Sequence, residues 1–322
     1  ELNNFDMASC YFLIAESEKR KKNFDKEIDL LLNANKFSFK CNENKNIQAN
    51  EYWFNMIPKK FNRIVFNKNN KNFLDTKDIY PIFIIGLPRC GSTLIESIIS
   101  SGNDKVENLG ETNLVNWAFL NTNRDILKFS ANNKKILIDL DLTAKKLIDS
   151  IFNLDIKKND KVFFSEKSLE NFYYIELILN IFPNAKFINP YRNLTDNVFA
   201  VYKQFLSNVS WSHSLENILV YFDNYLSTID YFKKKYPDKI ISIQLEEFTN
   251  NPEKSGKEIY NFCNLKWDTK CLDFYKREDL FTNTASINQI RSAVQKYDTR
   301  KYEPYKDILN VYFNKYVWLN NN

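Results

Sequence analysis

Glycine is scarce in this sequence. Only 5 of the 322 residues are glycine, whereas ordinary proteins contain about 7%. Four of the five, Gly86, Gly91, Gly102 and Gly110, nevertheless fall between residues 86 and 110. In a chain that otherwise does without glycine, this clustering indicates a segment whose backbone needs conformations that only glycine tolerates.

The cysteines and the hydrophobic runs exclude several classes of protein. The five cysteines are odd in number and widely scattered, and no two have the spacing of metal ligands or of a redox motif: Cys10, Cys41, Cys90, Cys263 and Cys271. We therefore expect reduced cysteines in a cytoplasmic protein without a metal site. No apolar run approaches the roughly 20 residues of a membrane span, and no signal-peptide pattern is present.

Charge and histidine content also argue against some functions. The formal net charge is only +5, and lysine and glutamate are interspersed along the chain, which is typical of a solvated mixed surface and not of nucleic-acid binding. The single histidine, His213, stands in SWSHSLEN at an expected helix start. We interpret it as a capping or surface residue.

The chain divides into a helical prefix and an alternating region. Residues 5–58 contain apolar positions at helical spacing only, and the spacing of Ala15, Phe24 and Ala34 loosely fits a tetratricopeptide unit. Apolar runs at 82–86, 161–165, 185–190 and 239–244 then predict buried parallel strands. Helical patterns lie between and after these strands, at 92–101, 133–153, 170–182, 194–207, 214–236 and 252–265. We predict a prefix over residues 1–75, followed by a P-loop-type, doubly wound α/β domain over residues 76–322 with helices flanking a parallel sheet.

The first expected strand leads into a phosphate-loop pattern. PIFIIGLPRCGSTLIESIIS contains Gly86-x-x-x-x-Gly91-x-Thr93, but Ser92 stands where nucleotide triphosphatases carry a lysine. A strand, a tight loop and a helix N-terminus direct backbone N–H groups and the helix dipole at an anion. The pattern therefore predicts a phosphate-binding loop that does not depend on the usual lysine.

Three segments together resemble PAPS-dependent sulfotransferases, and especially the bacterial enzymes that join a tetratricopeptide segment to a domain related to tyrosylprotein sulfotransferase. They are the loop PIFIIGLPRCGSTLIESI, the segment SEKSLENFYYIELILNIFPNAKFINPYRN and the late segment TASINQIRSAVQKYDTRKYEPY. The resemblance implies 3′-phosphoadenosine 5′-phosphosulfate (PAPS) as co-substrate and no metal. Because this donor has no γ-phosphate, the loop can dispense with the lysine, and Arg89 supplies positive charge.

The resemblance also implies which residues bind the donor. Cys90, Gly91, Ser92 and Thr93 would surround the 5′-phosphate together with Arg89. Arg192 matches the residue that binds the 3′-phosphate, Ser286 matches a serine at the sulfate end, and Lys301 matches a late basic residue on the donor phosphates.

Catalysis of sulfuryl transfer is expected to rest on positioning and on stabilisation of dispersed negative charge. Lys167 matches the lysine that stabilises the bridging oxygen of the leaving group, and Arg89 suits a developing oxyanion. Glu111, in the sequence GET, matches the general base that accepts the proton of the acceptor hydroxyl. The expected catalytic residues are thus Glu111, Arg89, Lys167 and Ser286.

Two positions depart from the family pattern. Ala200 stands where a serine is expected near the 3′-phosphate, which removes a hydrogen bond of about 0.5–1.5 kcal/mol. Leu245 stands where many relatives have tyrosine. Neither change removes a charge, so both bear on donor affinity more than on activity.

Two other functions remain open from the sequence. A P-loop kinase is disfavoured by Ser92 and by the lack of a clear acidic metal site at a strand end. A non-catalytic helical-repeat scaffold with a lapsed sulfotransferase domain is disfavoured by the joint presence of Arg89, Glu111, Lys167 and Ser286. The resemblance implies an acceptor that offers a hydroxyl group, either a small molecule or a peptide with a tyrosine.

Overall fold

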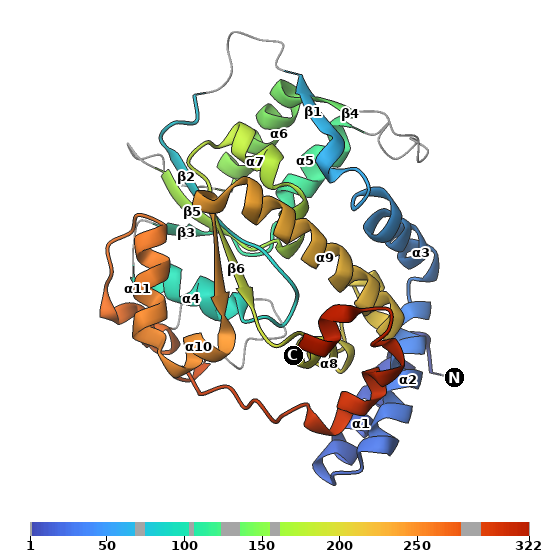
Figure 1. Cartoon of the computed structure of the whole chain (residues 1–322). Coiled ribbons are helices and arrows are strands. Elements are labelled where there is room, and N and C mark those ends of the chain that lie inside the picture. The colour runs from blue at the N-terminus through green and yellow to red at the C-terminus, as the bar shows by residue number, and fades with distance from the viewer. Residues whose placement is uncertain are drawn as a thin grey trace. The chain divides into compact units, whose positions relative to one another are not determined.

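The computed structural model describes residues 2–67, 75–102, 106–123, 136–154, 162–277 and 291–321. The chain forms two compact units. Unit 1 combines residues 1–58, 192–227 and 298–322, and unit 2 combines residues 59–191 and 228–297. Each unit therefore brings together stretches that lie far apart in the sequence (Figure 1). The boundary expected at residues 75 and 76 stays a prediction.

Unit 2 contains a parallel sheet of five strands in the order β3-β5-β2-β6-β7. The strands are β2 (Ile79–Ile84), β3 (Val106–Asn108), β5 (Val162–Glu166), β6 (Lys186–Tyr191) and β7 (Ile240–Gln244). The four predicted strands correspond to β2, β5, β6 and β7, which confirms the α/β architecture. Strand β2 lies at the centre, and ligands of such open sheets bind outside the carboxyl ends of the strands.

Helices flank this sheet (Figure 1). Those of unit 2 are α4 (Ser92–Gly102), α5 (Leu114–Thr122), α6 (Leu140–Phe152), α7 (Ile175–Ile181), α10 (Leu245–Asn250) and α11 (Pro252–Phe262). Alternate side chains of a strand face opposite sides of its sheet. Ile82 and Ile84 of β2 accordingly pack with apolar residues of α4, α10 and α11. Phe83 faces the other way and stacks on Phe187 of β6, with ring centroids 5.6 Å apart.

One predicted helix begins later than expected. Within the predicted 133–153 helix, residues Ile136–Asp139 form strand β4, which pairs in parallel with β1 (Ile64–Asn67). Helix α6 begins only at Leu140, where the Asp139 carboxylate accepts a hydrogen bond from the Leu142 backbone N–H at 3.0 Å. A short apolar run does not distinguish a buried strand from a helix by periodicity alone.

Unit 1 contains the N-terminal helices that the sequence predicts: α1 (Asn4–Arg20), α2 (Phe24–Lys40) and α3 (Glu43–Glu51). Ala15 of α1 and Ala34 of α2 are buried, and their small side chains allow the two helices to approach closely. The tetratricopeptide interpretation of these helices stays a prediction.

A buried ion pair joins the distant segments of unit 1. The Glu27 carboxylate of α2 lies 2.7 Å from the Lys203 Nζ, in the residue after α8 (Leu194–Tyr202). It also accepts a hydrogen bond from the Tyr305 hydroxyl at 2.8 Å, and the Lys203 ammonium lies 3.6 Å from the centre of the Tyr305 ring. Truncation of one partner would leave an uncompensated buried charge, so these contacts hold the segments together.

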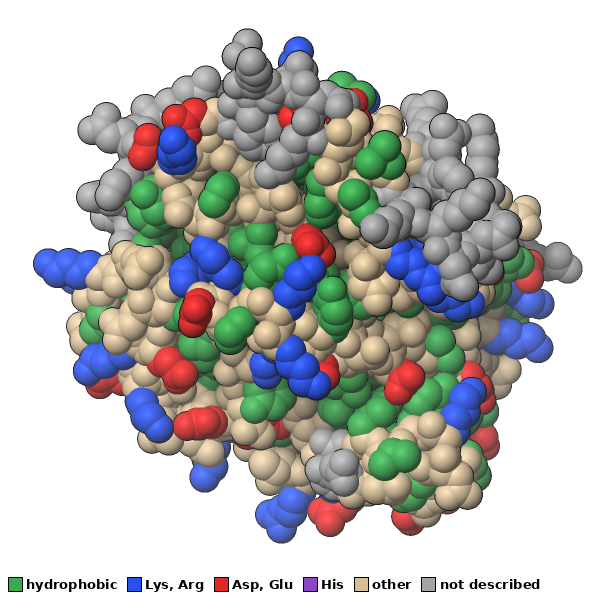
Figure 2. Space-filling view, turned by 45° about the horizontal axis from the view of Figure 1, so that its top comes forward, with side chains coloured by type: hydrophobic (Ala, Val, Ile, Leu, Met, Phe, Trp, Pro, Cys, Tyr) green, Lys and Arg blue, Asp and Glu red, His purple; other side chains and the backbone are tan. Residues whose placement is uncertain are grey.

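Three further features concern the surface charges, the helices and the possible metal ligands. Basic and acidic side chains are interspersed over the face shown in Figure 2. None of the helices in the described residues is long and apolar enough to cross a membrane. Within the same ranges, no three His, Cys, Asp or Glu side chains gather in a way that would hold a metal ion.

The expectation of a capping or surface position for His213 is wrong. His213 is only 8% exposed, and its ring packs edge-on against Phe39 with centroids 5.9 Å apart. Neither ring nitrogen has a hydrogen-bond partner among the described residues. The cap of α9 (Leu215–Lys235) is instead Ser214, whose hydroxyl accepts a hydrogen bond from the Asn217 N–H at 3.1 Å.

We predict that His213 makes the protein less stable in mild acid. Burial lowers the pKa of His213 to about 4, below the value of about 6.5 for an unfolded chain. Between these values the unfolded state binds more protons, so stability is full above pH 6.5 and falls as the pH drops toward 4. The loss from pH 8 to pH 5 should be about 2 kcal/mol smaller in His213→Leu than in the wild type. Urea unfolding at both pH values measures it, and an equal loss in both proteins would contradict the assignment.

Candidate functional site

The loop between β2 and α4 has the backbone conformation that the glycine pattern predicts. Gly86 and Gly91 adopt φ angles of 141° and 94°, which side-chain-bearing residues rarely adopt. Arg89 also has a positive φ of 66°, an uncommon conformation that marks functional loops. The Gly86 N–H donates to the Leu169 carbonyl at 3.1 Å, so the loop is tied to the segment that follows β5.

Gly91 also lies close to the side chain of Leu245. A Cβ atom at position 91 would lie 2.7 Å from the Leu245 Cδ1. Leu245, the first residue of α10, therefore packs directly on the phosphate loop. The departure at position 245 thus replaces a polar hydroxyl by methyl groups in contact with the loop backbone.

Helix α4 begins at the end of this loop. Ser92 and Thr93 are its first two residues and are 7% and 5% exposed. An α-helix leaves its first N–H groups without intrahelical acceptors, and the positive end of the helix dipole lies there as well. The start of α4 thus combines buried hydroxyls with backbone donors, which suits a phosphate or sulfate group.

Lys167 and Glu111 come together at the carboxyl ends of β5 and β3. The Lys167 Nζ forms an ion pair with the Glu111 Oε1. Lys167 is 1% exposed, whereas the side chain of Glu111 is 49% exposed. The Lys167 N–H also donates to the Gly110 carbonyl at 2.8 Å, which extends the β3–β5 pairing and fixes the two side chains next to each other. The structure therefore brings together two of the residues predicted to be catalytic.

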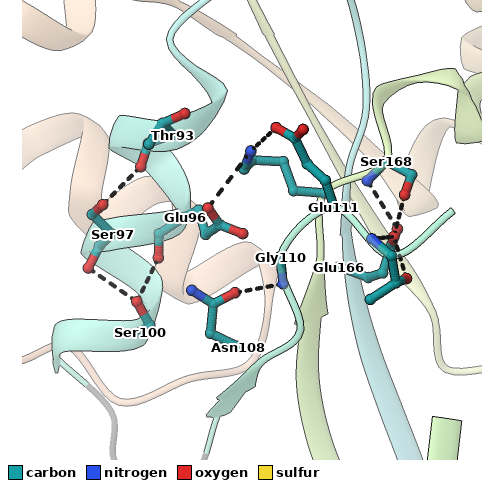
Figure 3. Close-up of polar contacts among 11 residues, drawn as sticks. Thr93, Glu96, Ser97, Ser100, Asn108, Gly110, Glu111, Glu166 and Ser168 are labelled. Carbon is teal, nitrogen blue, oxygen red and sulfur yellow. Dashed lines mark hydrogen bonds and ion pairs between the residues drawn. The ribbon is translucent and has the colours of Figure 1, made fainter. Parts of the chain in front are cut away.

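A second carboxylate, Glu96, approaches the same ammonium from α4. Its Oε2 lies 3.7 Å from the Lys167 Nζ, and its side chain is 2% exposed. Figure 3 shows Glu96 and Glu111 directed toward the nitrogen that both contact. Lys167 thus lies between one buried and one half-exposed carboxylate.

Glu166, next to Lys167, ties two loops of the site together. Its carboxylate accepts hydrogen bonds from Thr112 (backbone at 3.2 Å, hydroxyl at 2.8 Å), from Ser168 (backbone at 3.0 Å, and hydroxyl) and from the Asn171 amide at 2.6 Å. Burial raises the pKa of Glu166, and the bonds from Ser168 and Thr112 oppose that rise. Glu166 therefore fixes the chain on both sides of the Lys167–Glu111 pair.

Three of the other predicted residues belong to unit 1, and one lies outside the described residues. Arg192, Ala200 and Lys301 belong to unit 1. The Arg192 guanidinium carbon and the Lys301 Nζ lie 5.3 Å and 5.5 Å from the centre of the same Tyr302 ring. Ala200 is buried in α8. Ser286 lies outside the described residues.

Sequence reasoning missed Glu96 and Glu166. Glu96 is the only charged residue in the apolar helix STLIESIIS, and a lone carboxylate at a buried helical position is a signal that could have been read. Glu166 directly precedes Lys167, at the end of a buried strand, where the polar groups of an open α/β sheet gather.

Comparison with known proteins identifies the family of the chain. Residues 81–269 match the sulfotransferase family. The sulfotransferase domain of the Synechococcus PCC 7002 olefin synthase has a similar fold, with a TM-score of 0.53 and 16% identity over 72% of this chain and 90% of that domain. A sulfotransferase from Alicyclobacillus acidocaldarius aligns with a TM-score of 0.43 and 14% identity over 74% of this chain and 92% of that one.

An uncharacterized protein of Aquifex aeolicus (strain VF5) is 26% identical over 324 aligned positions, which cover 94% of this chain. The chain spans 40% of the length of that curated relative. Because the family match extends over more than half of the sequence, the chain belongs to the sulfotransferase family.

Proposed function

We propose that this protein transfers a sulfuryl group from PAPS to a hydroxyl group of a small molecule or peptide, with tyrosine and other phenols or alcohols as the candidate acceptors. The observation that carries the proposal is the Lys167–Glu111 ion pair, because it combines a buried cation with a more exposed carboxylate beside a phosphate loop. The helical prefix is proposed to be tetratricopeptide-like, as in the enzymes related to tyrosylprotein sulfotransferase.

The residues present fit such a donor. The loop offers positive-φ glycines, the start of a helix and the half-buried Arg89, which together favour a phosphate or sulfate group. Gly91, with a φ of 94°, packs against the Leu245 side chain. Cys90, Gly91, Ser92 and Thr93 are proposed to surround the 5′-phosphate, and Arg192 and Lys301 are proposed for the 3′-phosphate and the other donor phosphates. PAPS would supply the sulfuryl group and leave as adenosine 3′,5′-bisphosphate.

Lys167 and Glu111 would then have separate tasks. In the ion pair each neutralises the other, so neither is available for chemistry. An anion at the loop gives the Lys167 ammonium a partner in place of Glu111 and leaves the Glu111 carboxylate open to a hydroxyl proton. As the acceptor oxygen bonds to sulfur and the bond from sulfur to the bridging oxygen breaks, Glu111 takes the hydroxyl proton. Lys167 and Arg89 stabilise the negative charge that develops on the leaving oxygen and on the sulfuryl group, with Ser286 proposed as a further contact.

Mass spectrometry tests the reaction directly. Incubation of the wild type with PAPS and a pooled set of peptides, phenols, sugars and lipids should add one SO₃ group to at least one acceptor. Mg-ATP in place of PAPS should give no transfer.

Arg89→Ala should abolish transfer and weaken donor binding by about 1.5–3 kcal/mol, because a charge-assisted bond is lost. Unchanged turnover and calorimetric affinity in that variant would overturn the assignment of the donor loop.

Glu111→Gln should separate binding from chemistry. The substitution keeps the size of the side chain but removes its basicity, so the rate should fall by about 10²–10⁴-fold. Affinity for adenosine 3′,5′-bisphosphate should stay the same or rise, because Lys167 loses its competing carboxylate. The rate loss should be smaller for acidic phenols than for aliphatic alcohols, whose protons are harder to remove. Normal turnover of an alcohol by the variant would show that Glu111 is not the base.

A further inference from the structure

Glu96 is buried where a carboxylate is unfavourable. It lies on α4 one turn after the phosphate loop and is 1% exposed, and its helical neighbours Ile95, Ile98 and Ile99 pack in the apolar core. Burial of a carboxylate costs free energy unless it is paired and hydrogen-bonded. A glutamate at this position therefore calls for a reason other than stability.

The surroundings of Glu96 do not satisfy its carboxylate fully. The Ser97 and Ser100 hydroxyls donate instead to the helix carbonyls of Thr93 and Glu96, both at 2.8 Å (Figure 3). Within the described ranges, the Glu96 Oε1 has no hydrogen-bond partner. Among the described residues, Lys167 is the only cation that forms an ion pair with Glu96, with its Nζ 3.7 Å from the Glu96 Oε2.

Three charged groups face Glu96 from the neighbouring elements. Burial raises the pKa of Glu96 to about 7, the Lys167 charge lowers it, and the Glu111 and Glu166 charges raise it further. Lys167 and Glu166 come from the end of β5, and Glu111 comes from the segment after β3. The Glu96 carboxyl is thus close to half protonated at neutral pH. A change in the nearby charges therefore changes its protonation state.

We propose that Glu96 is a positioning and charge-balancing residue behind Lys167, which holds the ammonium when Glu111 releases it and takes up a proton when an anion binds at the loop. This inference rests on the proposed function. With both carboxylates ionised, the group Glu96, Glu111 and Lys167 carries one excess negative charge. An additional anion in a poorly solvated site increases the repulsion, and protonation of Glu96 removes it without displacing Lys167.

Calorimetric titration with adenosine 3′,5′-bisphosphate tests the proton uptake. Titrations at pH 7 in buffers of different ionisation enthalpy give the number of protons bound with the nucleotide. The wild type should take up as much as about half a proton more than Glu96→Gln, because a carboxyl with a pKa near 7 is half ionised at this pH. In Glu96→Gln the side chain at position 96 carries no charge at any pH. The protons that the nucleotide itself exchanges are the same for both proteins, so they cancel when the proton uptake of the variant is subtracted from that of the wild type.

The affinity gives a second readout, which a merely structural role would not produce. Between pH 6.5 and pH 8.5 the affinity of the wild type should fall several-fold more than that of Glu96→Gln. Near pH 6.5 the two proteins should bind equally, because glutamine resembles the protonated acid, whereas Glu96→Ala should bind more weakly since Lys167 loses its support. Glu253→Gln is the matched control: it removes one exposed carboxylate of unit 2, in α11, and should behave like the wild type.

The outcomes separate the two claims. Binding of the nucleotide with equal proton uptake and equal pH dependence in the wild type and Glu96→Gln would overturn the inference alone. Failure of the wild type to bind the nucleotide would overturn the proposed function and, with it, the inference. Should Glu96→Gln not fold, Glu96→Met removes the same charge with a side chain of similar length, and the same expectations for protons and pH dependence apply to it.

Discussion

A buried ammonium needs carboxylates beside it, and the site depends on how Lys167 meets that need. Lys167 is 1% exposed and contacts Glu111 on one side and Glu96 on the other. Removal of one partner of a buried ion pair is strongly destabilising, by about 3–5 kcal/mol, so a cation held by a single carboxylate could not change partners cheaply. With two carboxylates beside it, Lys167 can turn from the half-exposed Glu111 toward an arriving anion, whose charge then replaces that of Glu111, while Glu96 stays next to the ammonium. In the function that we propose, this arrangement keeps a buried cation available for the donor.

The sheet explains how three segments converge on this nitrogen. Lys167 directly follows β5, Glu111 follows β3, and Glu96 lies on the helix after the loop that leaves β2. These three strands are neighbours in the order β3-β5-β2, and parallel strands place their carboxyl ends at the same edge. Glu166 then anchors the segments around Thr112 and Ser168 by hydrogen bonds. The site is therefore positioned by backbone pairing as much as by the contacts among its own side chains.

What the sequence predicted correctly is local. The β2 strand, the glycine-bearing loop and α4 follow from an apolar run and from positions where only glycine fits. Glu111 and Lys167 were recognised by resemblance, but their ion pair was not predicted, because it depends on β3, a strand of 3 residues that leaves no hydrophobic pattern. Glu96 and His213 show the same limit: whether a polar side chain in an apolar neighbourhood is paired, or buried without a partner, depends on residues distant in the sequence. The effect of Ala200 on donor affinity likewise depends on residues that are distant in the sequence.

In the mechanism that we propose, Lys167 exchanges Glu111 for the donor. A crystal structure with adenosine 3′,5′-bisphosphate measures this most directly, through the distance from the Lys167 Nζ to the nearest oxygen of the nucleotide's 5′-phosphate. We expect a charge-assisted hydrogen bond of about 2.7–2.9 Å, with the 5′-phosphate at the N–H groups of Gly91, Ser92 and Thr93. Glu96 would remain beside the ammonium, and Glu111 would have turned away from it. A nucleotide bound away from the loop, or one bound at the loop while Lys167 still contacts only Glu96 and Glu111, would show that this exchange does not occur.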